Sequence, residues 1–344
     1  GARRRHVQHH LALAVAARTH LAGPERGSWL QRLDTERENL LAAHAWCLRD
    51  PEGRDADLQL VFVLKTYWHL RGLLNLGYRV TLEALARTDP AQRDRGRCRV
   101  LCDAGQLCHF TGRHDEARAY LEESHAIALE LGDKARVAAV LQPLGMVHVA
   151  RGDSARALAI YEEAVALARE LGNPWLLMAS TNALAQLHRV HGDLVRADTL
   201  FAQTLDTART LDQPESMAIA LLNRAMVSVL QHQHGAARDG LRQAAELADA
   251  TGSSPLLQSL LDVAAGLAAD TGQWQACGEL FGAAQAMAQA TGNQRESEDA
   301  AFLLPLIERA RQAAGDEVFA AAEARGRADG PDAARQGLQR LLQA

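Results

Sequence analysis

Cysteine and histidine side chains, which can bind metal ions or act as nucleophiles, are concentrated in one stretch of the sequence. This stretch contains Cys98, Cys102, Cys108 and His109. Cys98 and Cys102 are one helical turn apart and share one face of a helix. Cys108 lies roughly three turns from Cys98 along the same helix, and one rigid helix cannot wrap these groups around a single ion. The spacing therefore favours small buried packing residues over a metal site.

No other group of reactive side chains has the spacing of a catalytic site. His6 and His10 share a helix face near the start of the chain, where solvent exposure is the expected state. No strand-turn-helix pattern is present to position a Ser–His–Asp or Cys–His set. The carboxylates, such as those of Glu122 and Glu123, follow helix surfaces. We therefore predict no catalytic residue, no metal ligand and a chain that is not an enzyme.

The composition indicates that helices position these side chains. Hydrophobic residues make up 48% of the 344 residues but aromatic residues only 4%, and most of the apolar content is Ala and Leu. Both are strong helix formers, whereas sheet proteins use more β-branched and aromatic residues. The fold class that we predict is all-α.

Charge and cysteine content narrow the classes of partner and compartment. The formal net charge is −5, a poor electrostatic match for a phosphate backbone, so no direct contact with nucleic acid is predicted. The five cysteines lack disulfide-type spacing and predict a reducing, cytoplasmic location. No uncharged apolar run of about 18 residues is present, so no membrane span is predicted.

A 40-residue repeat organises the chain. Gly112, Gly152 and Gly192 recur at this interval, and each precedes a new helical pattern. Three further series keep the same register: a bulky series, a small series, and a series that closes each unit. In that order they are Leu121, Tyr161, Phe201, Leu241 and Phe281; Gly105, Gly145, Ala185, Ala225 and Ala265; and Gly132, Gly172, Asp212, Gly252 and Gly292. Agreement between independent series at one period is typical of repeat architectures.

Each series has a structural role in a helical hairpin. Glycine ends a helix in the left-handed conformation without a steric penalty, and Asp153 and Asp193 are expected to cap the helices that follow. The small series lets two helices approach closely, and the bulky series fills the space between units. His232 replaces the turn glycine in one unit, which we expect to distort that unit.

The spacing of Gly145, Ala157 and Tyr161 is that of a tetratricopeptide unit, although the period is about six residues longer than usual. We therefore predict an α-solenoid, a right-handed superhelix of tetratricopeptide-like helical hairpins with a ~40-residue period. Residues 1–90 form an irregular helical region with a degenerate repeat, residues 91–292 form five helical pairs, and residues 293–344 form capping helices. The chain does not begin with Met, so we expect it to be part of a longer protein.

Two stretches outside the regular repeats carry a family resemblance. The first is Trp29-Leu-x-Arg32-Leu33, which continues through Glu36, Asn39 and Leu40 to Trp46. The second is Leu280-Phe281-Gly282-Ala283-Ala284, followed later by Gly315-Asp-Glu-Val-Phe319. Together they resemble the C-terminal sensor region of bacterial signal-transduction ATPases of the STAND class, which include LuxR/MalT-like and kinase- or cyclase-linked regulators. The resemblance implies signal transduction or transcription regulation, with ATP bound only in an upstream domain. This chain has no G-x-x-x-x-G-K-[ST] loop, so no cofactor is expected in it.

In tetratricopeptide arrays the first helix of each pair lines the concave face, which predicts a binding surface. The candidate residues are Arg99, Gln106, His109, Gln142, Met146, Asn182, Gln186, Arg189, Leu222, Met226 and Asp262. A mixed polar and apolar groove suits a peptide or a protein helix. We predict a protein or peptide partner, with a small inducer as an alternative. The other alternative is that this surface is solvated and binds no ligand.

The leading function is the sensor region of a multidomain ATPase-type regulator. A stand-alone receptor for a signalling peptide and a plain assembly scaffold are the alternatives. If the groove is used, replacing Asn182 and Arg189 by Ala should abolish partner binding with little loss of thermal stability.

Overall fold

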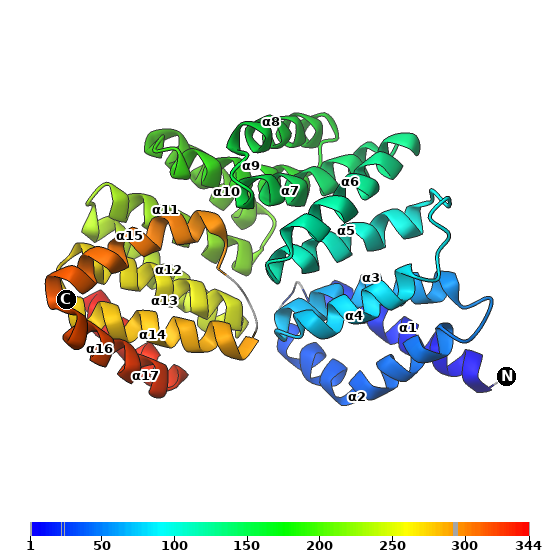
Figure 1. The fold of residues 1–344 in the computed structure, drawn as a ribbon, viewed down its shortest axis with the longest axis horizontal. Helices are drawn as coiled ribbons and strands as arrows, with labels where there is room; N and C mark the ends of the chain where they lie inside the picture. The colour runs from blue at the N-terminus through cyan, green and yellow to red at the C-terminus, as the bar shows by residue number, and fades with distance from the viewer. Residues whose placement is uncertain (1, 22, 24, 292–294, 344) are drawn as a thin grey trace. The chain divides into compact units, whose positions relative to one another are not determined.

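The computed structural model describes residues 2–21, 23, 25–291 and 295–343, and these residues form seventeen helices and no strand. The all-α prediction is confirmed. The chain divides into two compact units, Gly1–Leu176 and Leu177–Ala344, hereafter unit 1 and unit 2. Figure 1 shows the course of the helices from the N-terminus in blue to the C-terminus in red.

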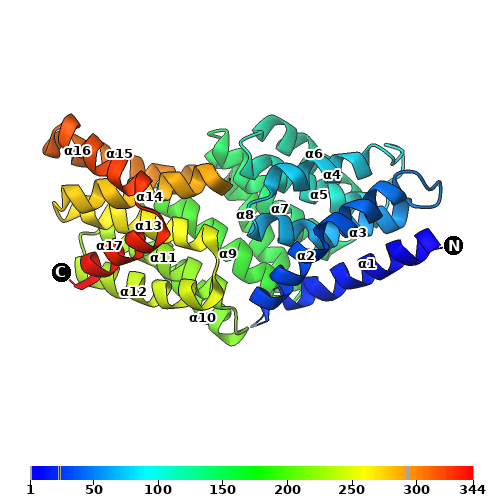
Figure 2. The ribbon, with the colours of Figure 1, turned by 90° about the horizontal axis from the view of Figure 1, so that it is seen from below.

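Unit 1 is built from antiparallel helix pairs. Its helices are α1 Ala2–His20, α2 Arg26–Cys47, α3 Arg54–Leu70, α4 Leu74–Leu85, α5 Arg95–Phe110, α6 His114–Glu130, α7 Lys134–Ala150 and α8 Ser154–Glu170. The first helices α3, α5 and α7 pack in sequence against one another, as Figures 1 and 2 show. Each second helix packs on its own first helix.

Unit 2 continues the same pattern and ends in three further helices. Its helices are α9 Pro174–Val190, which begins just before the unit boundary, α10 Leu194–Thr210, α11 Pro214–Leu230, α12 His234–Thr251, α13 Ser254–Asp270, α14 Trp274–Thr291, α15 Ser297–Ala314, α16 Asp316–Ala328 and α17 Pro331–Gln343. Helix α13 packs against α11 on one side and against α15 on the other. Helix α16 packs on α14.

The helix ends follow the repeat chemistry. The side chains of Asp153 and Asp193 accept hydrogen bonds from the backbone N–H of Arg156 and Arg196, so both expected caps are confirmed. Gly152 adopts a left-handed backbone conformation with φ +79°. Gly292, which was expected to close the last pair, lies outside the described residues.

The unit with histidine at the turn is not distorted. His232 adopts φ +57°, in the left-handed region that the glycines at the equivalent positions also occupy, and α11 and α12 on either side of it are continuous helices. The prediction of a distorted unit was wrong, because His232 itself adopts the left-handed conformation, at a cost of about 1–2 kcal/mol.

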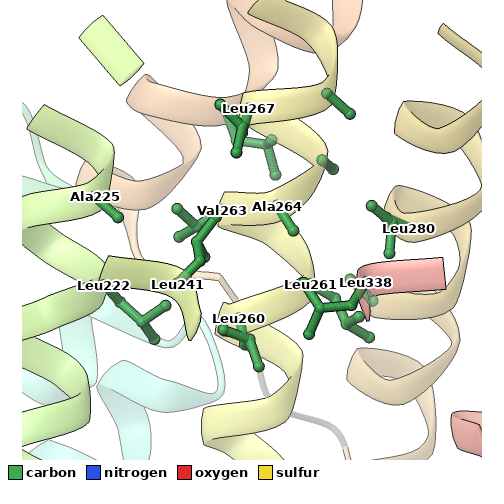
Figure 3. Packing of buried hydrophobic residues seen from close by; sticks show 14 of the residues in the cluster. Leu222, Ala225, Leu241, Leu260, Leu261, Val263, Ala264, Leu267, Leu280 and Leu338 are labelled. Carbon is green, nitrogen blue, oxygen red and sulfur yellow. The ribbon is translucent and has the colours of Figure 1, made fainter. Parts of the chain in front are cut away.

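The small and bulky series meet inside the α5–α6 and α7–α8 hairpins. A Cβ atom added to Gly145 would lie 2.2 Å from the Tyr161 ring, and one added to Gly105 would lie 2.5 Å from Leu121. Tyr161 therefore packs on Gly145 within its own hairpin, in addition to any role between units. In unit 2 the core is formed by leucines and small residues of α11 to α14 and α17 (Figure 3).

The five cysteines are buried free thiols, in agreement with the packing role predicted for Cys98, Cys102 and Cys108. None of the described helices is long and apolar enough to cross a membrane.

Candidate partner-binding surface

The predicted binding residues all lie on the first helices of the five regular pairs, α5, α7, α9, α11 and α13. We call the surface that they define the first-helix face, and describe it separately for each unit. In unit 1 it comprises Arg99, Gln106 and His109 on α5 and Gln142 and Met146 on α7.

Polar contacts in unit 1 link α5 to the preceding pair. The Gln106 carboxamide oxygen accepts a hydrogen bond from Lys65 on α3. The Arg99 guanidinium lies 5.1 Å from the centroid of the Phe62 ring, and the Arg18 guanidinium lies 3.9 Å from the same ring. Phe62 therefore holds two cations by cation–π contacts, which also shield its ring from water.

His109 and Met146 contribute little to an accessible surface. Both side chains are buried. Burial lowers the pKa of His109 to about 4, with a smaller effect from His114, so the ring is neutral at physiological pH. Next to Met146, the Gln142 amide donates a hydrogen bond to the Met146 sulfur at 3.0 Å. Gln142 and Gln106 are both half-buried.

Four cations surround one buried carboxylate in unit 1. Burial raises the pKa of Asp103 to about 6, while the positive charges around it oppose this rise. Those cations come from four different helices, and we call them the basic cluster. Its members are Arg18 on α1, Lys65 on α3, Arg99 on α5 and Arg136 on α7. A second carboxylate, Asp133, also acts on Arg99 and Arg136 but is paired with Arg95, so this face carries excess positive charge in a chain whose net charge is negative.

Two members of the basic cluster have unused hydrogen-bonding capacity. The Nε atoms of Arg99 and Arg136 are buried and have no hydrogen-bond partner among the described residues. Burial, together with repulsion from Arg136, lowers the pKa of Arg99. Arg99 also lines, with Phe62, a cavity of about 520 Å³. Because both Nε atoms are buried, the terminal nitrogens of these half-buried side chains are the groups that can donate to an incoming anionic group.

In unit 2 the first-helix face is covered by the chain itself. Arg189 on α9 is buried and donates a hydrogen bond to Asp299 on α15 at 2.9 Å. Asp262 on α13 accepts two hydrogen bonds from Arg295, at 2.9 and 2.7 Å. Gln186 on α9 bonds with Glu296. Three of the predicted binding residues of unit 2 thus have partners in the segment 295–299.

Apolar contacts hold the same segment in place. The Phe302 ring lies directly on Gly266 of α13, where an added Cβ atom would come within 2.6 Å of it. The Arg189 guanidinium lies 5.9 Å from the centroid of that ring. Ions and apolar groups together therefore fix the start of α15 on α9 and α13.

The other predicted residues of unit 2 belong to its interior. Leu222 and Met226 are each 3% exposed and contribute to the hydrophobic core, so they present no groove in this structure. Asn182 accepts a hydrogen bond from Asn223 at 3.2 Å. Because Asn182 and Arg189 both have intramolecular partners, their replacement should cost stability, contrary to the expectation from the sequence.

Sequence reasoning missed Arg18, Lys65, Asp103 and Arg136. Arg18 and Lys65 lie before the regular repeats, where the register is weak. Asp103 and Arg136 lie within them, at positions that the repeat pattern alone did not select. Lys65 and Arg136 lie near the positions that are one repeat away from Gln106 and Arg99. A search for cations near those positions could have found both residues.

The comparisons with known proteins agree with this architecture. The family model for the tetratricopeptide repeat matches residues 96–170, and that for anaphase-promoting complex subunit 5 matches residues 181–271. No curated protein matches the chain.

Solved structures with peptides bound resemble the chain in fold. A Rap protein complexed with competence and sporulation factor has a TM-score of 0.68 at 11% identity, over 92% of this chain and 82% of that one. NprR in complex with its cognate peptide NprX has a TM-score of 0.53 at 14% identity, over 91% and 87%. The Rap conjugation gene regulator of plasmid pLS20 with the Phr* peptide has a TM-score of 0.52 at 14% identity, over 86% and 74%. The chain is an all-α solenoid that contains tetratricopeptide-type repeats.

Proposed function

We propose that this chain is a regulatory binding region that captures an acidic segment of a peptide or protein on the first-helix face of unit 1. The observation that carries the proposal is the basic cluster, in which Arg18 and Arg99 lie on one Phe62 ring and Lys65 bonds with Gln106. Charge complementarity of this kind selects partners and speeds their association.

The chemistry of this face suits an extended or helical segment. Arg99 and Arg136 are half-buried, and the terminal nitrogens of their guanidinium groups can form charge-assisted hydrogen bonds to a carboxylate of the partner. The half-buried amides of Gln106 and Gln142 can bond to a peptide backbone.

Peptide complexes of proteins with this fold support the choice of ligand class. Two solved structures that resemble the chain hold a peptide, and a third holds competence and sporulation factor. Their low sequence identity transfers no binding residue, so the acidic character of the partner rests on the basic cluster alone.

We place this binding region in a multidomain regulator of the signal-transduction ATPase type, on the resemblance of the stretches that contain Trp46 and Phe281. Partner binding would bias the switch domain of that regulator. The upstream sequence of the full-length gene tests this setting. A phosphate-binding loop there would support it, and the lack of one would favour the stand-alone peptide receptor or the scaffold. Buried free thiols fit the cytoplasm as the compartment.

Fluorescence anisotropy with a labelled decapeptide of alternating Glu and Ala tests the binding proposal. We expect binding that weakens as salt increases, and no binding of the Lys–Ala peptide. The variant Arg99→Ala/Arg136→Ala should lose at least about fivefold in affinity, because it removes two charge-assisted contacts.

The matched control is Arg156→Ala/Arg169→Ala, which removes two exposed arginines of α8 and the same net charge. It should bind like the wild type. Equal losses in both double variants would reduce the effect to net charge and would contradict the proposed surface.

A further inference from the structure

Two departures from the repeat meet at one point of unit 2. The turn between α11 and α12 has His232 where the equivalent turns have Gly112, Gly152, Gly192 and Gly272. His232 takes the left-handed conformation that glycine adopts at those positions. A side chain that keeps a conformation costly for it often marks a functional site.

The second departure is at the end of α13. Asp270 occupies the position that is apolar in the other helical pairs, as in Phe110, Val190 and Leu230. Its side chain is only 4% exposed. A carboxylate buried at an apolar position requires strong partners.

A second histidine, close to His232 in sequence, supplies one of those partners. His234, at the start of α12, directs Nε2 to Asp270 Oδ2 at 2.8 Å, and His232 directs Nδ1 to the same oxygen at 2.8 Å. The three donor atoms lie within 4.8 Å of one another. Arg309 on α15 donates to the other carboxylate oxygen, Oδ1, at 3.2 Å.

The convergence of two imidazoles on one oxygen distinguishes this group from an ordinary ion pair. A simple pair needs one histidine, whereas here two imidazoles share one oxygen of a carboxylate whose side chain is 4% exposed. Two neutral imidazole nitrogens and one carboxylate oxygen are the donor set of many three-ligand zinc sites.

We infer that His232, His234 and Asp270 form a binding site for a single Zn²⁺ ion, with solvent completing the coordination. The donor set excludes Ca²⁺ and Mg²⁺ as preferred ions, because these select all-oxygen ligands. The hydrogen bond from Arg309 to the second oxygen orients the ligating carboxylate, as partners of metal ligands commonly do.

Zinc at this point would join separate elements of unit 2. The ligands come from the α11–α12 turn, the start of α12 and the end of α13, and Arg309 connects Asp270 to α15. An ion bound only by the folded chain stabilises it in proportion to its concentration. Zinc should therefore raise the melting temperature of the chain.

Calorimetric titration of ZnCl₂ into the tag-free, chelator-treated chain tests the inference. We expect one site with a dissociation constant of about 10 µM or lower. The variant His232→Gly restores the residue of the other turns, so it should fold at least as well as the wild type. It should lose at least about tenfold in zinc affinity and most of the zinc-dependent rise in melting temperature.

The variant His6→Ala/His10→Ala is the matched control, since it removes another close pair of imidazoles, in unit 1. It should keep the wild-type affinity. Absorption of bound Co²⁺ should show tetrahedral bands in the wild type and in this control, and lose them in Asp270→Asn. A dissociation constant for zinc above about 1 mM in the wild type, or an unchanged constant in His232→Gly, would overturn the inference. The three residues would then be ion-pair partners and not metal ligands.

Discussion

The guanidinium of Arg189 on α9 donates a hydrogen bond to the carboxylate of Asp299 on α15, at 2.9 Å and across 110 residues of sequence. The Arg189 side chain is 1% exposed, and the ion pair with Asp299 supplies a compensating charge. This bond places the start of α15 on the first-helix face of unit 2. The corresponding face of unit 1 has a basic cluster instead, and this difference determines where we expect a partner to bind.

Replacement of Arg189 by Met tests how much this bond contributes to stability. The change leaves Glu296, Glu298 and Asp299 close together without their shared cation. We expect the free energy of unfolding to fall by about 2 kcal/mol, less than for a fully buried pair because Asp299 keeps some contact with water. Urea denaturation measures the change, and proteolysis should cut near residue 297 sooner. Arg335→Met, which removes an exposed ion pair, should have little effect, and equal stability of the two variants would refute the role of Arg189.

The same segment predicts a pH dependence of stability. Burial and the neighbouring carboxylates of Glu298 and Asp299 raise the pKa of Glu296 from 4.5 to about 8. Between these values the folded chain holds a proton that the unfolded chain has released, so stability should fall as the pH rises from about 4.5 to 8. Glu296→Gln should reduce this slope in urea titrations at pH 5, 6, 7 and 8. Glu308→Gln, at an exposed position of α15, is the control, and the prediction fails if both variants keep the wild-type slope.

The charge of Asp103 should tune binding in unit 1. Burial raises its pKa from 3.8 to about 6, so at pH 7.5 it is ionised and offsets part of the basic cluster. Asp103→Asn should therefore bind the Glu–Ala decapeptide about fivefold more tightly at pH 7.5, because it removes a negative charge that repels the acidic peptide at close range. Wild-type affinity should rise as the pH falls to 5.5, whereas the variant should show little change. Glu162→Gln on the exposed side of α8 should behave like the wild type. A pH response in Asp103→Asn equal to that of the wild type would exclude Asp103 as its source.

The contact between Gly145 and Tyr161 predicts a cost of overpacking. An added Cβ atom would lie 2.2 Å from the ring, so Gly145→Ala must push the two helices of the hairpin apart. We expect a loss of about 1–3 kcal/mol in the free energy of unfolding, measured by urea denaturation. Gly235→Ala provides a control, because Gly235 is exposed on α12 with no atom near its missing Cβ. Unchanged stability in Gly145→Ala would show that the hairpin is less tightly packed than the structure indicates.

The local structure was predictable because it depends on residues close in sequence. Gly152 and Asp153 signal the end of one helix and the cap of the next within two positions, and the structure has both. Arg99 and Gln106 were identified as candidates because they lie in the regular repeats, where position on the helix follows from register.

The long-range contacts were not predictable in this way. Arg189 appeared as a free anion-binding residue, because nothing in the repeat indicates that Asp299 lies against it. Leu222 and Met226 appeared as groove residues, although the packing of α11 and α13 buries them. Asp270 and His232 were visible as departures from the repeat, but only the fold places their side chains on one another.

Hydrogen–deuterium exchange of the chain with and without the Glu–Ala decapeptide tests the proposed binding surface most directly. We predict slower exchange in α5 and α7, which contain Arg99 and Arg136, and little change in α6 and α8 of the same unit. Protection limited to unit 2 or to α6 and α8, or no protection at saturating peptide, would contradict the proposal that the basic first-helix face of unit 1 binds the partner.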